Sequence, residues 1–256
     1  MQWRCLLIGL FAAVPVVEAQ LPPNLPYDGR AILARLRYHS TMDPDGCQDA
    51  DGSGGPGWGH DYPASVQGLM KAATELTSLE APVDSFVTLN ADDTLLLKYP
   101  VAMVTEPGCW NPTDTEVVAL RNYLLKGGFL VVDDPTFSDV TPEHCELAIQ
   151  RFETWIHRVL PAAQIVRVPT SDPIFDGFFQ VNPETLPPFW GSQPEIRGIY
   201  RDNDPTKSLM VIANYRYALG HQWRWVGNGL GSGLGSGDEA TAYQLGLNYL
   251  VYGLSH

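Results

Sequence analysis

A strand–helix–strand pattern in the middle of the chain constrains its fold most. Residues 100–105 (PVAMVT) form a continuous apolar run, which is typical of a strand buried on both faces. Thr113 and Glu116 then form a capping box, which predicts the start of a helix, and Gly127-Gly128 predicts its end. A second apolar run follows at 129–132. Two parallel strands joined by a right-handed helical crossover fit this order.

The rest of the chain continues the alternation of strands and helices. It predicts an α/β fold with three layers, in which a flavodoxin-like, doubly wound and mostly parallel sheet has helices on both faces. We expect a single domain over 31–256 after an extended, proline-rich lead-in at 20–30, while 169–195 shows little periodicity. The other predicted strands are 31–38, 85–89, 164–168 and 209–214, and the other predicted helices are 63–79, 141–160 and 238–254.

The net charge excludes two classes of partner. The 256 residues include 16 Lys and Arg against 29 Asp and Glu, which gives a net charge of −13. Binding to nucleic acid without sequence preference needs clustered basic residues, and so does docking on anionic lipid. We therefore expect neither.

The first 19 residues have the pattern of a cleavable signal peptide. Arg4 precedes a short apolar run over 6–17, and Val17-Glu18-Ala19 supplies small residues at the cleavage positions. The run is too short for a membrane anchor, and no later segment is long and apolar enough to span a membrane. We expect a secreted or periplasmic protein with no membrane span in the mature chain.

Export changes the interpretation of the cysteines. Cleavage of the signal peptide removes Cys5 and leaves Cys47, Cys109 and Cys145. In an oxidising compartment these three cysteines allow one disulfide. We expect Cys109 to pair with Cys145, with Cys47 as the alternative partner; buried, unpaired thiols are the other interpretation. A zinc site that combines these cysteines with His60 and His144 has no Cys-x-x-Cys spacing to support it.

Acidic residues gather where the predicted strands end. Asp133 and Asp134 follow a buried strand, and His60 and Asp61 close a long loop after the first strand. Ligands of doubly wound folds bind at this edge, so these four are the candidate catalytic residues, as a general base or cation ligands. Ordinary turn chemistry is the alternative for the two aspartates.

The loop at 39–62 is a weak calcium candidate. Asp49-x-Asp51-x-Ser53-Gly54 resembles the start of an EF-hand loop, but position twelve is His60 where that motif has Glu. A solvated acidic loop is the preferred interpretation, and no cofactor is expected. The calcium candidates are Asp43, Asp45, Asp49 and Asp51.

Aromatic and basic side chains give the candidate binding residues. Trp58 and Trp110 stand in neighbouring loops and could stack on a sugar beside the carboxylates, although loop anchoring is the commoner role. Arg35 and Arg37 lie on the polar face of the first strand and complete this set.

Five short motifs are spread over nearly the whole mature chain. They are Arg35-Leu36-Arg37-Tyr38, Asp61-Tyr62-Pro63, Leu97-Lys98-Tyr99-Pro100, Gly127-Gly128-Phe129-Leu130-Val131-Val132-Asp133-Asp134 and Ala242-Tyr243-Gln244-Leu245-Gly246-Leu247-Asn248.

On these motifs the chain resembles the bacterial domain-of-unknown-function family 4159 from about residue 31 to residue 254. The resemblance implies a fold similar to the class I glutamine amidotransferase-like superfamily. It also implies possible partners among envelope proteins of von Willebrand-type and MoxR-associated systems. The chain departs from the family at 168–173, where Val-Pro-Thr-Ser-Asp-Pro replaces a run that often contains His. It also lacks a glycine-flanked cysteine, which argues against glutaminase chemistry.

Three classes of function follow from these observations. A non-enzymatic ligand-binding or envelope-assembly module is favoured, because no catalytic set is complete. The first alternative is a hydrolase-like enzyme that acts on a glycan or another small polar substrate through the acidic edge, with or without the help of a metal ion. The second is a calcium-stabilised structural domain.

Overall fold

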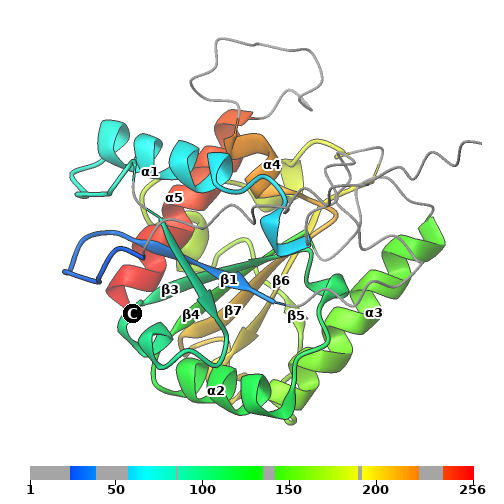
Figure 1. The fold of residues 1–256 in the computed structure, drawn as a ribbon. Helices are drawn as coiled ribbons and strands as arrows, with labels where there is room; N and C mark the ends of the chain where they lie inside the picture. The colour runs from blue at the N-terminus through cyan, green and yellow to red at the C-terminus, as the bar shows by residue number, and fades with distance from the viewer. Residues whose placement is uncertain (1–23, 39–56, 85, 135–141, 190–191, 225–238) are drawn as a thin grey trace, which may run out of the picture.

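A seven-stranded sheet runs through the centre of the molecule (Figure 1). The computed structural model describes residues 24–38, 57–84, 86–134, 142–189, 192–224 and 239–256. The strands are β1 (Leu33–Arg37), β2 (Val87–Asn90), β3 (Val101–Thr105), β4 (Phe129–Asp133), β5 (Val166–Arg167), β6 (Glu195–Tyr200) and β7 (Leu209–Tyr215).

The sheet is mostly parallel, as the sequence predicts. Its order is β2-β1-β3-β4-β7-β6-β5, and β2, β1, β3, β4 and β7 are parallel neighbours. The last two strands, β6 and β5, are antiparallel to their neighbours. Strand β6 is absent from the prediction, because Gly198 interrupts the alternation of polar and apolar residues in its sequence.

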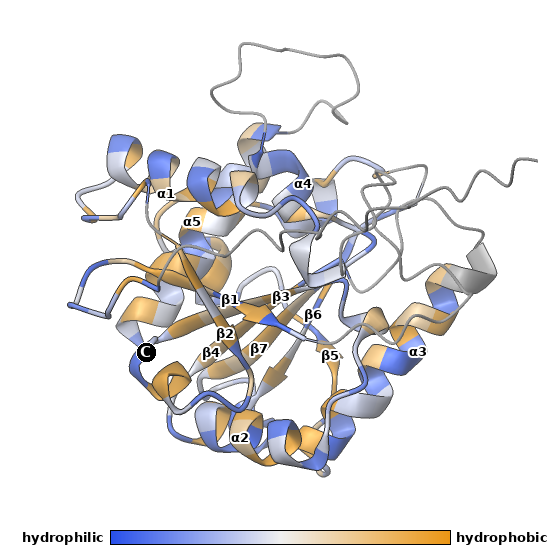
Figure 2. Ribbon diagram, in the orientation of Figure 1, coloured by the Kyte–Doolittle hydropathy of each residue, from blue (hydrophilic) through white to orange (hydrophobic). Residues whose placement is uncertain are grey.

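Helices cover both faces of the sheet and make three layers (Figure 1). On one face lie α1 (Ala64–Leu76), α4 (Leu219–Trp223) and α5 (Glu239–Ser255). On the other lie α2 (Asp114–Leu125) and α3 (Pro142–Val159). Apolar strands separate two cores, and the hydrophilic sides of the helices face outward (Figure 2). The predicted three-layer α/β fold is therefore confirmed.

Local interactions fix the ends of α2. The Thr113 side chain accepts a hydrogen bond from the Glu116 amide, and the Glu116 carboxylate accepts one from the Thr113 amide, so the capping box is formed. After the helix, Gly127 has a φ of +104°, a conformation that favours glycine. This helix therefore begins and ends where its sequence predicts.

Close packing holds α4 against α1 and α5. A Cβ atom on Gly68 of α1 would lie 1.9 Å from the backbone oxygen of Trp223, and one on Gly246 of α5 would lie 2.5 Å from the Trp223 ring. The Trp223 indole also donates a hydrogen bond of 2.9 Å to the Ala242 carbonyl. These contacts position the short helix α4, which the sequence did not predict.

Within the described ranges, no helix combines the length and apolar character needed to cross a membrane. The predicted signal peptide over 1–19 lies outside the residues that the structure describes.

Candidate functional site

The chain reverses its direction of winding between β1 and β3. From β1 it passes through α1 on one face to the edge strand β2, and from β3 it passes through α2 on the other face to β4. Such a switch point leaves a space at the carboxyl ends of the two strands, where ligands of open α/β sheets bind. The turn at Gly57–Gly59 and the turn at Pro107–Cys109 contact each other there.

A buried histidine and a buried glutamate meet at this point. Nδ1 of His60 lies 2.5 Å from Oε1 of Glu106, and the two side chains are 8% and 3% exposed. Burial opposes the charged imidazole, but the hydrogen bond and charge of Glu106, with the charges of Asp61 and Asp134, outweigh it and raise the pKa of His60 to about 9. His60 is therefore held cationic by its carboxylate neighbours.

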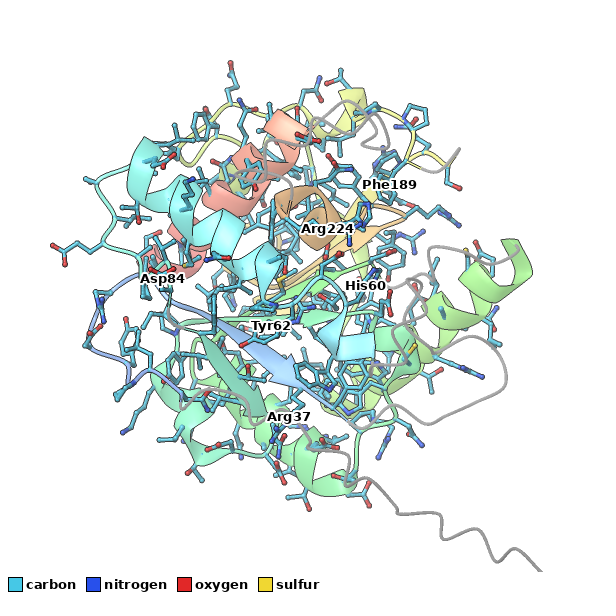
Figure 3. All side chains as sticks on the ribbon, turned by 45° about the horizontal axis from the view of Figure 1, so that its top comes forward. Arg37, His60, Tyr62, Asp84, Phe189 and Arg224 are labelled. Carbon is cyan, nitrogen blue, oxygen red and sulfur yellow. The ribbon has the colours of Figure 1, made fainter. Side chains whose placement is uncertain are left out.

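Asp61 connects this pair to the end of α4. Its Oδ1 accepts a hydrogen bond of 2.6 Å from Arg224, and its Oδ2 lies 3.6 Å from Nδ1 of His221 and 3.7 Å from Nε2 of His60. Burial favours the neutral acid, yet the His221 hydrogen bond and the neighbouring cations lower the pKa of Asp61. We refer to His60, Asp61, Glu106, His221 and Arg224 together as the edge cluster, of which Figure 3 labels His60 and Arg224.

Arg35 supports the backbone segment that carries the first residues of the edge cluster. Its guanidinium is fully buried and donates hydrogen bonds to the carbonyls of Trp58 (2.9 Å) and His60 (2.8 Å). The predicted binding residue thus supports the backbone that carries His60. Arg37, also predicted as a binding residue, bonds the Asn90 side chain on the neighbouring strand β2.

The two aspartates after β4 have different surroundings. Asp133 is fully buried and accepts hydrogen bonds from the amides of Leu219 (2.8 Å) and Gly220 (2.9 Å). Burial raises its pKa to about 6, against the effect of these two bonds. Asp133 therefore anchors α4, which carries His221. Asp134 is also buried, with a φ of +44°, and its charge acts on His60.

The two candidate tryptophans do not share a surface. Trp110 is 3% exposed, with its ring stacked on Tyr38 at 5.3 Å and packed against Trp155 at 4.9 Å. Trp58 is half-buried and lies 5.9 Å from the Tyr62 ring. The structure thus places Trp110 in the core below α3, away from any ligand-facing position.

The cysteine and calcium predictions lie partly outside the described residues. Cys109 is buried and Cys145 is partly buried, and in the described part of the chain no disulfide joins them. The predicted alternative partner and the predicted calcium ligands are not described. These are Cys47, Asp43, Asp45, Asp49 and Asp51.

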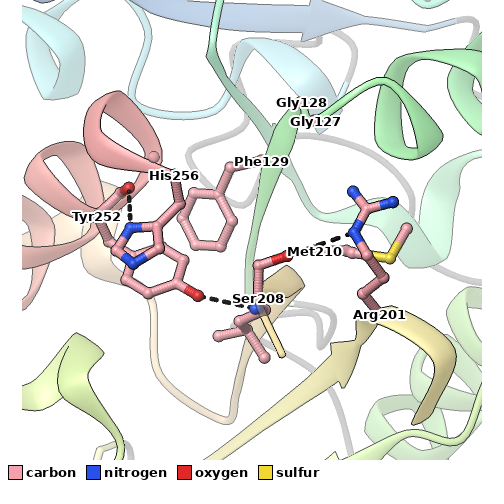
Figure 4. A pocket seen from close by; sticks show the side chains of 10 residues that line it. Gly127, Gly128, Phe129, Arg201, Ser208, Met210, Tyr252 and His256 are labelled. Atoms are coloured by element: carbon pink, nitrogen blue, oxygen red, sulfur yellow. Dashed lines mark hydrogen bonds between the residues drawn. The ribbon is translucent and has the colours of Figure 1, made fainter. Parts of the chain in front are cut away.

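A small pocket lies at the opposite edge of the sheet, where β4 and β7 begin (Figure 4). The Tyr252 hydroxyl accepts a hydrogen bond from the Leu209 amide there, and the Tyr252 ring stacks on His256 at 4.1 Å. Arg201 donates to the carbonyls of Leu124 and Leu125. Because these polar groups already bond the protein, the pocket does not have the character of a polar ligand site.

Sequence analysis missed three members of the edge cluster. Glu106 directly follows a predicted strand, as Asp133 does, so its position at a strand end was a signal in the sequence. His221 and Arg224 gave no such signal, because the short helix between 214 and 238 was not predicted. Within the described residues, one group of side chains has the donor atoms and spacing to hold a metal ion: His60, Asp61 and His221.

Comparison with known proteins gives a family but no relative of known activity. A family model described as "Domain of unknown function (DUF4159)" matches residues 33–254, a range that includes the whole edge cluster. No curated protein matches the chain.

Proposed function

The chain belongs to the DUF4159 family, and on that premise we propose that it is an exported, non-enzymatic module that binds a small polar ligand at the edge cluster. One observation carries the proposal. Segments far apart in the sequence bring five ionisable side chains together at the switch point of the sheet, where ligands of this fold class bind.

The cost of burial supports a binding role. Removing charged side chains from water is unfavourable, and replacing a buried ionic group by apolar residues is often neutral or stabilising. A purely structural role therefore explains poorly why two histidines, two carboxylates and an arginine are gathered in a largely buried group. Perturbed ionisable groups in a cleft are typical of functional sites.

The solvent exposure of the cluster differs between its two sides. The side chains of His60 and Asp61 are 8% and 3% exposed, whereas those of His221 and Arg224 are 16% and 27% exposed. A ligand would therefore enter beside α4 and reach the histidine–glutamate pair behind it. Export is the second part of the proposal and depends on the signal-peptide pattern.

The first experiment is a thermal melt of residues 20–256 against defined ligand classes. The probes are divalent metals after chelator treatment, neutral mono- and disaccharides, dicarboxylic amino acids and inorganic phosphate. At a hundredfold excess over the dissociation constant, binding adds about 2.7 kcal/mol. That is a rise of roughly 5 to 10 °C for a domain of this size.

Two variants locate the binding. His221→Gln combined with Arg224→Gln alters the accessible side of the cluster and is expected to abolish the rise. Arg167→Gln alters an exposed arginine on β5, away from the cluster, and is expected to keep it. If no class of probe raises the melting temperature, or if the double variant leaves the rise intact, the proposal is wrong.

A further inference from the structure

We propose that His60, Asp61 and His221 bind a divalent transition-metal ion, with Zn²⁺ as the reference. This inference rests on the proposed function, because it names the ligand of the edge cluster.

The three donor atoms already have nearly the spacing that a metal site needs. Oδ2 of Asp61 lies 3.7 Å from Nε2 of His60 and 3.6 Å from Nδ1 of His221, and all three atoms are within 4.8 Å of one another. Tetrahedral zinc with bonds of about 2.0 to 2.1 Å separates its ligands by about 3.3 Å. Movements of a few tenths of an ångström close two of the separations, and the third, between the two histidine nitrogens, is at most 4.8 Å before a metal binds.

Glu106 orients one of the ligands. A carboxylate only accepts hydrogen bonds, so Nδ1 of His60 is the donor in the 2.5 Å contact with Glu106. The opposite ring nitrogen, Nε2, is then the one that faces Asp61. Metal-binding histidines commonly donate their second ring N–H to a carboxylate, which fixes the tautomer and strengthens the ligand. The His60–Glu106 pair has this arrangement, and the metal would displace the proton that the cationic His60 carries on Nε2, because only a neutral imidazole is a ligand.

Arg224 restricts how Asp61 can bind. It occupies Oδ1 at 2.6 Å, so Oδ2 is the oxygen directed at the two histidines. Asp61 would therefore be a ligand through one oxygen. Arg224 adds a positive charge beside the ion, and the carboxylates of Glu106, Asp61 and Asp134 offset the positive charge of the site in part.

The donor set selects the class of metal. Imidazole nitrogens suit Zn²⁺, Cu²⁺, Ni²⁺ and Fe²⁺, whereas Ca²⁺ and Mg²⁺ take oxygen ligands. Two imidazoles and one carboxylate leave at least one position of a tetrahedral ion for water or a small ligand. The site is therefore distinct from the calcium loop that the sequence indicated at Asp49 and Asp51.

The test is isothermal titration of chelator-treated residues 20–256 with Zn²⁺, together with Co²⁺ as a spectroscopic probe. We expect one equivalent of Zn²⁺ and a visible Co²⁺ absorption typical of tetrahedral nitrogen and oxygen ligands. His221→Gln lies at the accessible side of the cluster, and it should weaken Zn²⁺ binding by about 100-fold and remove the Co²⁺ absorption. His157→Gln, on the exposed side of α3, is the matched control and should change neither.

The outcomes separate this inference from the proposed function. Stoichiometric Zn²⁺ binding that His221→Gln leaves unchanged overturns the metal site at the cluster. If Zn²⁺ and Co²⁺ fail to bind but a sugar, amino acid or phosphate raises the melting temperature through Arg224, the inference falls and the proposed function stands. If no probe binds, both fall.

Discussion

His60 and Glu106 are 46 residues apart in the sequence, yet Nδ1 of the first lies 2.5 Å from Oε1 of the second. This contact joins the segment after β1 to the segment after β3 across the switch point of the sheet. It also sets the charge of the edge cluster, because Glu106 is the main contributor that keeps His60 cationic despite its burial.

Replacing Glu106 should change the titration of His60. In Glu106→Gln, burial of the imidazole is opposed only by more distant charges, so the pKa of His60 should fall from about 9 by about 1 to 3 units. The measurement is an NMR titration of the histidine ring resonances. Glu184→Gln, an exposed change far from the cluster, is the control. An unchanged His60 titration would show that the contact does not exist in solution.

Asp133 should make the stability depend on pH in a specific window. Its folded pKa of about 6 lies above the ordinary value of 3.8, so the folded state holds the proton more tightly than the unfolded state. The contribution of Asp133 to the free energy of unfolding is therefore fully present below about pH 4. It decreases by an amount on the order of 3 kcal/mol as the pH rises to about 6.

Urea unfolding of the wild type and Asp133→Asn from pH 4 to pH 7 measures this effect. The difference in unfolding free energy between the two should decrease over that range. Asp204→Asn is the control: hydrogen bonds from Thr206 lower the pKa of that exposed carboxyl below its ordinary value of 3.8, so its difference from the wild type should stay nearly constant between pH 4 and pH 7. A constant difference between wild type and Asp133→Asn would contradict the prediction.

Adding one methyl group at Gly68 should displace α4. The Cβ would lie 1.9 Å from the Trp223 backbone oxygen, so one of the two helices must move, at a cost of about 3 kcal/mol. Gly177→Ala is the matched control, since its nearest atom is 3.5 Å away. Urea unfolding checks the stability. Titration of Gly68→Ala with Zn²⁺ should also show weaker binding, because α4 carries His221.

The predicted disulfide can be tested on protein produced in an oxidising compartment. If Cys109 pairs with Cys145, reduction should lower the stability by about 3 to 4 kcal/mol. Peptide mapping without reduction would show the linked peptides, and Cys47→Ser should leave the link intact. Alkylation of all three thiols in the unfolded, unreduced protein would rule the bond out.

The centre of the sheet could be predicted because its signals are local. The apolar runs of β3 and β4 and the capping box at Thr113 and Glu116 each depend on neighbouring residues, and the observed elements agree within one or two residues. The strand β6 and the short helix α4 were missed. Their conformations depend on contacts with distant segments, such as the Asp133 carboxylate that accepts the amides of Leu219 and Gly220.

The candidate site was predicted in part for the same reason. The fold rule about strand ends led to His60, Asp61, Asp133 and Asp134, and all four lie at that edge. The rule could not distinguish their roles, because burial decides that Asp133 anchors a helix while Asp61 faces two histidines. His221 and Arg224 come from a helix whose position depends on Gly68 and Trp223.

The contact between Gly68 and Trp223 has a consequence for selectivity. The backbones of α1 and α4 already touch, and Asp133 holds the start of α4 while Arg35 holds the segment before Asp61. The segment that carries Asp61 and the helix that carries His221 are therefore both held in place in the absence of a bound ion. Discrimination among divalent ions should then follow ionic radius and preferred coordination geometry, because the chain has little freedom to adapt to a larger ion.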